Sequence, residues 1–157
     1  MVKQPNILYF LHKTMSESPK YDLTEFINAC SDERNVVVPV SVLNDAQRLF
    51  NLRSKKQLLD AIYAKDVHIT DFVNCRELEK NNFRDKSGNA IPVLVDAYYF
   101  CYTGDDGYLA FHIIPIPPNK WRLKSFHEQE KDAVTLLGDC LTPNQIERLK
   151  RIGNKGN

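Results

Sequence analysis

The sequence predicts an α+β fold, in which N-terminal helices pack on a three- to four-stranded antiparallel sheet and a C-terminal helix follows. Helical periodicity and helix-capping residues occur mainly between residues 22 and 62, and again after residue 141. Runs rich in β-branched and aromatic residues, separated by turns that contain Gly or Pro, fill residues 91–126. Helices and strands that are segregated along the chain are typical of α+β proteins.

Length and composition bound the domain organisation. The chain has 157 residues, of which 43% are hydrophobic and 26% are charged. These values are typical of one globular domain, so we interpret residues 1–157 as a single domain. The formal net charge is only +1. Overall charge therefore favours no particular partner, and nucleic-acid binding would require a local basic patch.

Cysteine use and the length of hydrophobic runs favour a cytoplasmic protein. The cysteines lie at positions 30, 75, 101 and 140, and none forms a CxxC pair. The apolar run at 6–11 is too short for a signal peptide, and no run approaches the roughly 20 residues of a membrane span. We expect no membrane association, no metal site and no small-molecule cofactor, because no P-loop, dinucleotide-binding motif or metal-ligand spacing occurs.

Capping patterns locate the predicted helices. Asp22 followed by Glu25 predicts the start of a helix near 23–30, and Ser54 followed by Gln57 predicts the start of another. Two further helical segments are expected, one from Ser41 through Phe50 and one from Thr142 to Gly153.

The strongest strand signals predict an antiparallel meander. Its three strands are expected at 91–102, 108–116 and 121–126, and its two turns at 104–107 and 117–120. A shorter strand is expected at 66–73, followed by a charged loop at 76–89. One face of this sheet must be covered by helices, and the other is free to meet solvent or a ligand.

The last predicted strand leads to His127, which is the best single candidate for catalysis. Strict alternation places Arg122 and Lys124 together on the face opposite Trp121, where two cations can hold a phosphate. The same alternation places His127 on the Trp121 face. An imidazole titrates near neutrality and suits general acid or base catalysis, but a histidine at a strand end is more often structural or merely exposed.

Tyr108 and the charged stretch supply further candidates. The Tyr108 hydroxyl can contact a phosphate, or its ring can stack on a base; its alternative reading is a partly buried strand tyrosine. Lys80 and Arg84 belong either to a mobile basic loop over a nucleic-acid strand or to a solvated loop, since acidic residues balance them. His112 lies among apolar residues and is interpreted as a core histidine.

Four segments resemble, in their order and rough spacing, the toxins of the motility quorum-sensing regulator type: "VSVLNDAQRLFNL" (40–52), "VDAYYF" (95–100), "GYLAFHI" (107–113) and "LKSFHE" (123–128). The resemblance covers roughly residues 36–129, a toxin-like core. It leaves 1–30 as an N-terminal extension and 130–157 as a C-terminal helical extension. It implies a RelE-like fold, cleavage of mRNA without metal, and neutralisation by a cognate antitoxin, so RNA and an antitoxin protein are the expected partners.

Carried over residue by residue, the resemblance implies that Tyr108 matches a strand tyrosine of the family's active site. His127 stands where the family has a lysine, and Val95 where it has a catalytic glutamine. Lys80 or Arg84 lies near the position of another functional lysine. The implied catalytic residues are His127, Tyr108 and Lys124, and the implied RNA-binding residues are Arg122, Lys120, Lys80 and Arg84.

Two functions remain open from the sequence. The first is a metal-independent endoribonuclease, in which the RNA 2′-oxygen attacks the adjacent phosphorus, with a base, an acid and cations assisting. The second is a non-enzymatic protein-binding module, such as a phage- or plasmid-encoded inhibitor, with Tyr98, Tyr99 and Tyr102 as anchors on an exposed sheet face. An enzyme requires His127, Tyr108 and a cation near one phosphate, whereas a binding module requires an aromatic patch.

Overall fold

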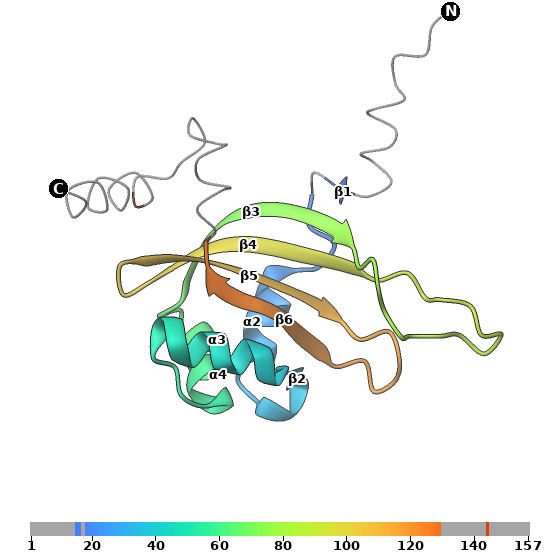
Figure 1. The fold of residues 1–157 in the computed structure, drawn as a ribbon, viewed down its shortest axis with the longest axis horizontal. Helices are drawn as coiled ribbons and strands as arrows, with labels where there is room; N and C mark the ends of the chain where they lie inside the picture. The colour runs from blue at the N-terminus through green and yellow to red at the C-terminus, as the bar shows by residue number, and fades with distance from the viewer. Residues whose placement is uncertain (1–14, 17, 130–143, 145–157) are drawn as a thin grey trace, which may run out of the picture.

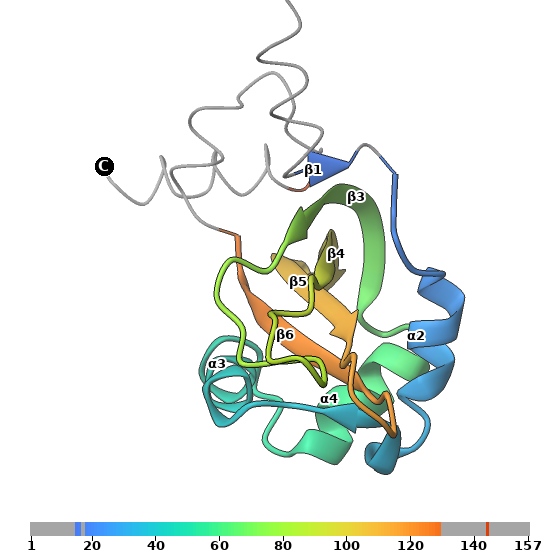
Figure 2. The same ribbon diagram turned by 90° about the vertical axis from the view of Figure 1, so that its right-hand side faces the viewer.

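The computed structural model describes residues 15–16, 18–129 and 144, and in this part the chain is α+β (Figure 1). The helices are α2 (Leu23–Ala29), the 3₁₀ turn η1 (Glu33–Asn35), α3 (Val40–Phe50) and α4 (Lys55–Tyr63). The strands are β1 (Met15–Ser16), β2 (Val36–Val37), β3 (His68–Glu77), β4 (Leu94–Tyr102), β5 (Asp105–Ile113) and β6 (Trp121–Glu128). The three α-helices pack on one face of the sheet (Figures 1 and 2).

The sheet is larger than predicted and mixed rather than purely antiparallel. It has six strands in the order β1-β3-β4-β5-β6-β2. The expected antiparallel meander is present as β3 to β6, but two edge strands of two residues each extend it, and β2 pairs with β6 in parallel. The predicted turn at 104–107 is shorter, because Asp105 and Asp106 already belong to β5.

Local capping explains where two of the helices begin. The Asp22 side chain accepts a hydrogen bond from the N–H of Thr24, and the Ser54 hydroxyl accepts one from the N–H of Gln57. Pro39 precedes α3 with φ of −60°, which suits a helix start and ends the short strand β2. Asn51 closes α3 in the left-handed conformation, which asparagine tolerates.

The main core lies between the helices and the sheet, and aromatic rings dominate it. Phe26 of α2 stacks on Phe111 of β5, with ring centroids 4.0 Å apart. Phe50 of α3 packs against Phe100 and Phe126, at 5.3 and 5.2 Å. Helix α4 adds a fully buried apolar set, made up of Leu58, Leu59 and Ile62. Helix α2 thus belongs to the main core, although the family resemblance leaves residues 1–30 outside it.

A buried carboxylate ties the segment before α2 to the centre of the sheet. Asp96 of β4 is fully buried and accepts hydrogen bonds from the backbone N–H groups of Lys20 and Tyr21, at 3.0 and 2.8 Å. The Tyr21 hydroxyl donates to the carbonyl of Leu94 at 2.7 Å. Charge-assisted hydrogen bonds satisfy the buried carboxylate and fix the entry of the chain into α2.

Several predictions fall on residues outside this description. The apolar run at 6–11 and the predicted helix from Thr142 to Gly153 lie there, apart from Asn144. Among the described residues, none of the helices has both the length and the apolar character needed to cross a membrane.

Candidate functional site

Strand β6 carries a bulge that changes which side chains meet. Leu123 is the Cα partner of Phe111 on β5, and Ser125 is the partner of Ala110. Lys124 is therefore an extra residue in β6 relative to β5. An inserted residue of this kind transfers every later side chain of the strand to the other face.

The bulge places His127 opposite to the predicted face. His127 is the Cα partner of Tyr108, and the two rings stack with centroids 5.1 Å apart and planes 21° apart. Trp121, by contrast, packs on the core face against α2. The prediction that His127 shares the face of Trp121 is wrong, because that prediction assumed unbroken alternation. The sheet face opposite the helices, here called the distal face, thus carries Tyr108, His127 and Arg122 together.

A groove crosses the distal face because two small side chains meet at its floor. Ala97 of β4 and Ala110 of β5 are Cα partners and are buried, together with Val95. Larger side chains border these small residues, and Tyr108 lies on one side of them. The resulting groove has a volume of about 590 Å³, which lies in the usual range of ligand sites.

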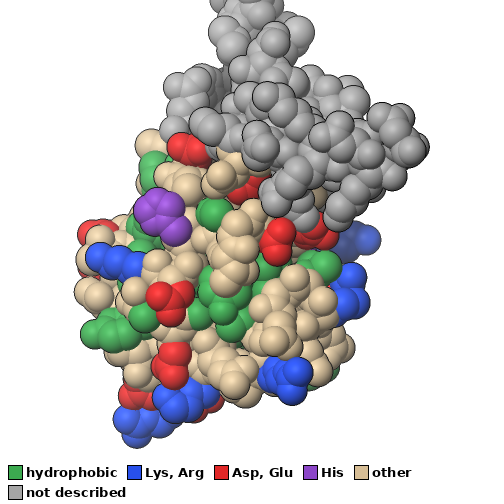
Figure 3. All heavy atoms as spheres, turned by 90° about the vertical axis from the view of Figure 1, so that its left-hand side faces the viewer, with side chains coloured by type: hydrophobic (Ala, Val, Ile, Leu, Met, Phe, Trp, Pro, Cys, Tyr) green, Lys and Arg blue, Asp and Glu red, His purple; other side chains and the backbone are tan. Residues whose placement is uncertain are grey.

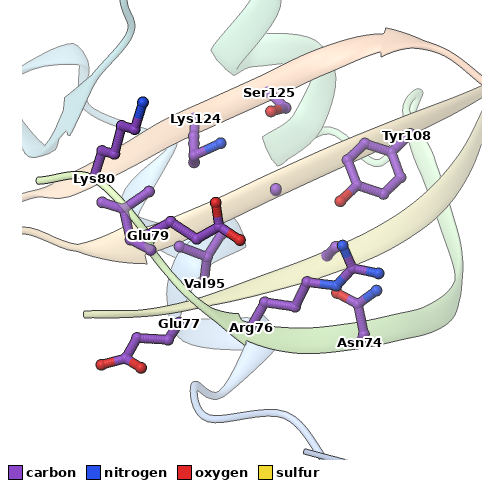
Figure 4. Close-up of a pocket in the computed structure, with 12 residues that line it drawn as sticks. Asn74, Arg76, Glu77, Glu79, Lys80, Val95, Tyr108, Lys124 and Ser125 are labelled. Atoms are coloured by element: carbon purple, nitrogen blue, oxygen red, sulfur yellow. The ribbon is translucent and has the colours of Figure 1, made fainter. Parts of the chain in front are cut away.

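The groove is lined by charged and polar side chains above its apolar floor (Figure 4). Lining residues from the strands are Asn74, Arg76, Glu77, Val95, Ala97, Tyr108, Ala110, Lys124 and Ser125, and those from the start of the β3–β4 loop are Leu78, Glu79 and Lys80. The Glu79 carboxylate turns toward the middle of the groove, whereas Glu77 points away from it (Figure 4). Three cations and one inward carboxylate therefore share this space with the Tyr108 phenol.

His127 is not among the residues that line the groove, but it stacks on Tyr108, which is. It is two residues beyond Ser125 on β6. Its Nδ1 lies 2.7 Å from the carbonyl oxygen of Glu128. A carbonyl only accepts hydrogen bonds, so Nδ1 donates in this contact, and a ring with one hydrogen would carry its lone pair on Nε2.

Arg122 lies apart from the groove, beneath the β3–β4 loop. Its guanidinium carbon is 5.5 Å from the centroid of the Phe83 ring, a cation–π arrangement. Its Cα partner His112 is fully buried, as predicted for a core histidine. Within the described residues, neither His112 Nε2 nor Arg122 Nε has a hydrogen-bond partner. Burial lowers the pKa of His112, and the neighbouring Arg122 charge acts in the same direction.

The other two cations predicted to bind RNA also lie outside the groove. Arg84 donates from Nη1 to the carbonyls of Asn81 and Phe83, at 3.1 and 2.9 Å, and so braces the loop that carries it. Lys120 is exposed in the turn before β6 and does not line the groove. The structure therefore brings together Tyr108, Lys80 and Lys124, and separates Arg84, Lys120 and Arg122 from them.

The three tyrosines proposed as binding anchors do not form one exposed face. Tyr98 is 5% exposed and stacks on Phe111, because its strand position points toward the helices. Tyr102 has the same parity and packs against Phe50. Tyr99 alone of the three lies on the distal face, where it is the Cα partner of Tyr108. The aromatic patch expected of a protein-binding module is therefore not present at these positions.

Arg76 and Glu79 are groove residues that the sequence analysis missed. The predicted strand ended at residue 73, but β3 continues to Glu77. Asn74 pairs with Ala97 and Arg76 with Val95, so both strand residues face the groove. A sequence signal for this longer strand was available. Asn74, Arg76 and Leu78 alternate with Cys75 and Glu77, as expected for residues on opposite faces of a strand.

Two cysteines near the core are poor nucleophiles. Burial raises the pKa of the Cys30 thiol to about 12. Burial, followed by the hydrogen bond with Asp96, raises the pKa of the Cys75 thiol to about 12 as well. Both thiols are protonated at neutral pH, so neither supplies the thiolate that cysteine chemistry requires.

Surface charge away from the groove is mixed. Viewed from the left-hand side of Figure 1, acidic and basic side chains are interspersed (Figure 3). Among the described residues, no group of three or more His, Cys, Asp and Glu side chains is arranged to hold a metal ion.

Comparison with known proteins adds no relative. No family model, no curated protein and no solved structure matches the chain. The function must therefore be argued from the groove itself.

Proposed function

We propose that the protein is a metal-independent endoribonuclease whose substrate lies in the groove on the distal face. The observation that carries this proposal is that Tyr108, Lys124, Lys80 and Arg76 all line one groove of about 590 Å³. Cations that surround a single site suit a phosphodiester, whose charge increases during cleavage.

The proposed reaction forms a bond from the RNA 2′-oxygen to phosphorus and breaks the bond from phosphorus to the 5′-oxygen. In this proposal His127 Nε2 accepts the proton of the 2′-hydroxyl, because Nδ1 is engaged with the Glu128 carbonyl. Lys124, Lys80 and Arg76 stabilise the negative charge that develops on the phosphate oxygens. The Tyr108 hydroxyl donates its proton to the departing 5′-oxygen, and the products carry a 2′,3′-cyclic phosphate and a 5′-hydroxyl.

Within this proposal the protein is a RelE-like toxin of a bacterial toxin–antitoxin module. Its α+β architecture, with helices on one face of an antiparallel core sheet, agrees with that assignment. A cognate antitoxin would then be the second partner. At position 127 histidine stands in place of the family's lysine, and it too can transfer a proton. At position 95 valine stands in place of the family's glutamine, and Glu79 supplies a polar side chain in the same groove.

The test is cleavage of a long single-stranded RNA in the presence of a divalent-metal chelator. We expect the wild type to cleave, and His127→Ala to be at least about 100-fold slower, because general base catalysis usually contributes that much. Ala110→Leu fills the groove floor without removing any reacting group and should also suppress cleavage. Lys56→Ala, on the helix side of the molecule, is the matched control and should cleave like the wild type.

The outcomes separate the two functions. Cleavage by the wild type that is strongly reduced in both His127→Ala and Ala110→Leu supports the endoribonuclease. Absence of cleavage by folded wild-type protein would contradict it and would favour the protein-binding alternative. Cleavage that persists in His127→Ala but is lost in Glu79→Gln would keep the enzyme and assign the base to Glu79 instead.

A further inference from the structure

An aromatic row runs beside the groove and is separate from its charged lining. Tyr99 of β4 is the Cα partner of Tyr108 on β5, and Tyr108 is the Cα partner of His127 on β6. The Tyr99 and Tyr108 rings meet edge to face, with centroids 6.5 Å apart and planes 63° apart. The Tyr108 and His127 rings stack at 5.1 Å. Three rings from three neighbouring strands thus form one row across the distal face.

Each ring of this row is partly exposed, in contrast to the tyrosines of opposite parity. Tyr99, Tyr108 and His127 all have intermediate exposure. Tyr98, one residue before Tyr99, is 5% exposed and packs in the core. Sheet alternation therefore places Tyr99 on the distal face and Tyr98 in the core.

The combination of a sheet-borne aromatic row and flanking cations indicates a particular kind of ligand. Unpaired bases stack on aromatic side chains, and nearby lysine and arginine side chains hold the phosphates that connect them. Duplexes hide their base faces and cannot use such a row. Arg76, Lys80 and Lys124 line the groove next to the aromatic row, so base-stacking and phosphate-binding groups lie side by side.

From this juxtaposition we infer that Tyr99 is a positioning residue, on which an unpaired nucleobase of the RNA strand in the groove stacks. This inference rests on the proposed function and deepens it by naming a residue that positions the substrate. Tyr99 does not line the groove and has no part in the proposed proton transfers, so its role is to position the strand.

The experiment uses a short single-stranded RNA in which every 2′-oxygen is methylated, so that it binds without being cleaved. One base near its centre is 2-aminopurine, whose fluorescence is quenched when it stacks on an aromatic ring. Tyr99→Leu should weaken binding by roughly tenfold and remove the quenching. Tyr99→Phe retains the ring and should behave like the wild type, while Tyr63→Leu replaces an exposed tyrosine on α4 as the matched control.

The results distinguish this inference from the proposed function. If wild type and Tyr99→Leu bind the single strand equally, with equal quenching, the stacking role is wrong while the endoribonuclease stands. If the wild type binds the same RNA equally well after annealing to its complement, the requirement for an unpaired nucleobase is wrong. If the folded wild type neither binds the methylated strand nor cleaves unmodified RNA, the proposed function fails together with the inference.

Discussion

His112 links the stability of the sheet to pH at the scale of one residue. Burial is the main reason that its pKa lies below the ordinary value of 6.5, and the charges of Arg122 and Lys124 lower that pKa further. The unfolded chain therefore binds a proton at this residue at a pH where the folded protein does not. By linkage, the stability gained from a neutral His112 is complete above about pH 6.5 and is lost as pH falls toward the folded pKa.

We predict that His112→Leu reduces the loss of stability between pH 7 and pH 5. The free energy of unfolding, measured with urea at each pH, should fall more steeply with acidification in the wild type than in this variant. His68→Leu, which replaces an exposed histidine on β3, is the matched control. Identical pH dependence in wild type and His112→Leu would show that this residue does not contribute.

At the scale of elements, the bulge at Lys124 decides the composition of the site. It allows Leu123 and Phe126, three positions apart, both to enter the core, and it brings His127 beside Tyr108. A strand of uninterrupted alternation would place Phe126 and His127 on the opposite faces from those observed. One extra residue therefore serves the core and the site together.

Deleting Lys124 should remove the bulge and leave the core intact. Leu123 and Ser125 already pair with the adjacent residues Phe111 and Ala110 of β5, so without Lys124 regular alternation keeps Phe126 in the core and His127 on the distal face. Deleting Lys86 from the exposed part of the β3–β4 loop is the matched control, and both deletions should change the free energy of unfolding by less than about 1 kcal/mol. Urea unfolding measures both changes, and a loss of about 3–5 kcal/mol on deleting Lys124, the cost of removing a phenylalanine from a core, would mean that Phe126 has left the core.

Helix starts and long strands were predictable because their signals are local. Asp22 and Ser54 form the capping contacts that the sequence suggested, and the composition of 91–126 marks β4, β5 and β6. The bulge was not predicted, because strict alternation was assumed along β6, although the three-residue spacing of Leu123 and Phe126 breaks that alternation. Strands β1 and β2 have two residues each, which is too short for any periodic signal.

The candidate site was predictable only in part, for a related reason. Tyr108, Lys80 and Lys124 were named from the sequence and do line one groove. Arg76 and Glu79 were missed because the end of β3 was placed too early. Arg122 and Lys124 share the distal face, as alternation predicted, but Arg122 packs against Phe83 and does not line the groove. Contacts between distant residues decide these points, and a single sequence does not display them.

At the scale of the whole molecule, the groove of a nearly neutral chain carries charges of both signs. The net charge is +1, and three cations and two carboxylates line the groove. RNA binding should consequently depend on salt as a local effect, with counterions released only from the phosphates that these side chains contact.

We predict that Lys124→Ala weakens binding of single-stranded RNA and lowers the slope of log affinity against log salt by about 1. Fluorescence anisotropy with the methylated RNA, over a series of salt concentrations, measures both quantities. Lys56→Ala is the matched control, because Lys56 is ion-paired with Asp60 on α4, at 2.8 Å. A slope that Lys124→Ala leaves unchanged would mean that Lys124 contacts no phosphate.

The long-range hydrogen bonds of the buried Asp96 affect when the chain can complete its fold during translation. These hydrogen bonds join residues 76 and 75 positions apart, and β2 pairs with β6, the last strand described. During translation Lys20 and Tyr21 emerge long before Asp96, which accepts their hydrogen bonds. Helix α2 likewise emerges long before Phe111, on which Phe26 stacks. Contacts of such high sequence separation form slowly. The N-terminal helices therefore cannot complete the packing of their apolar faces until β6 has left the ribosome, and until then chaperones and proteases compete for the chain.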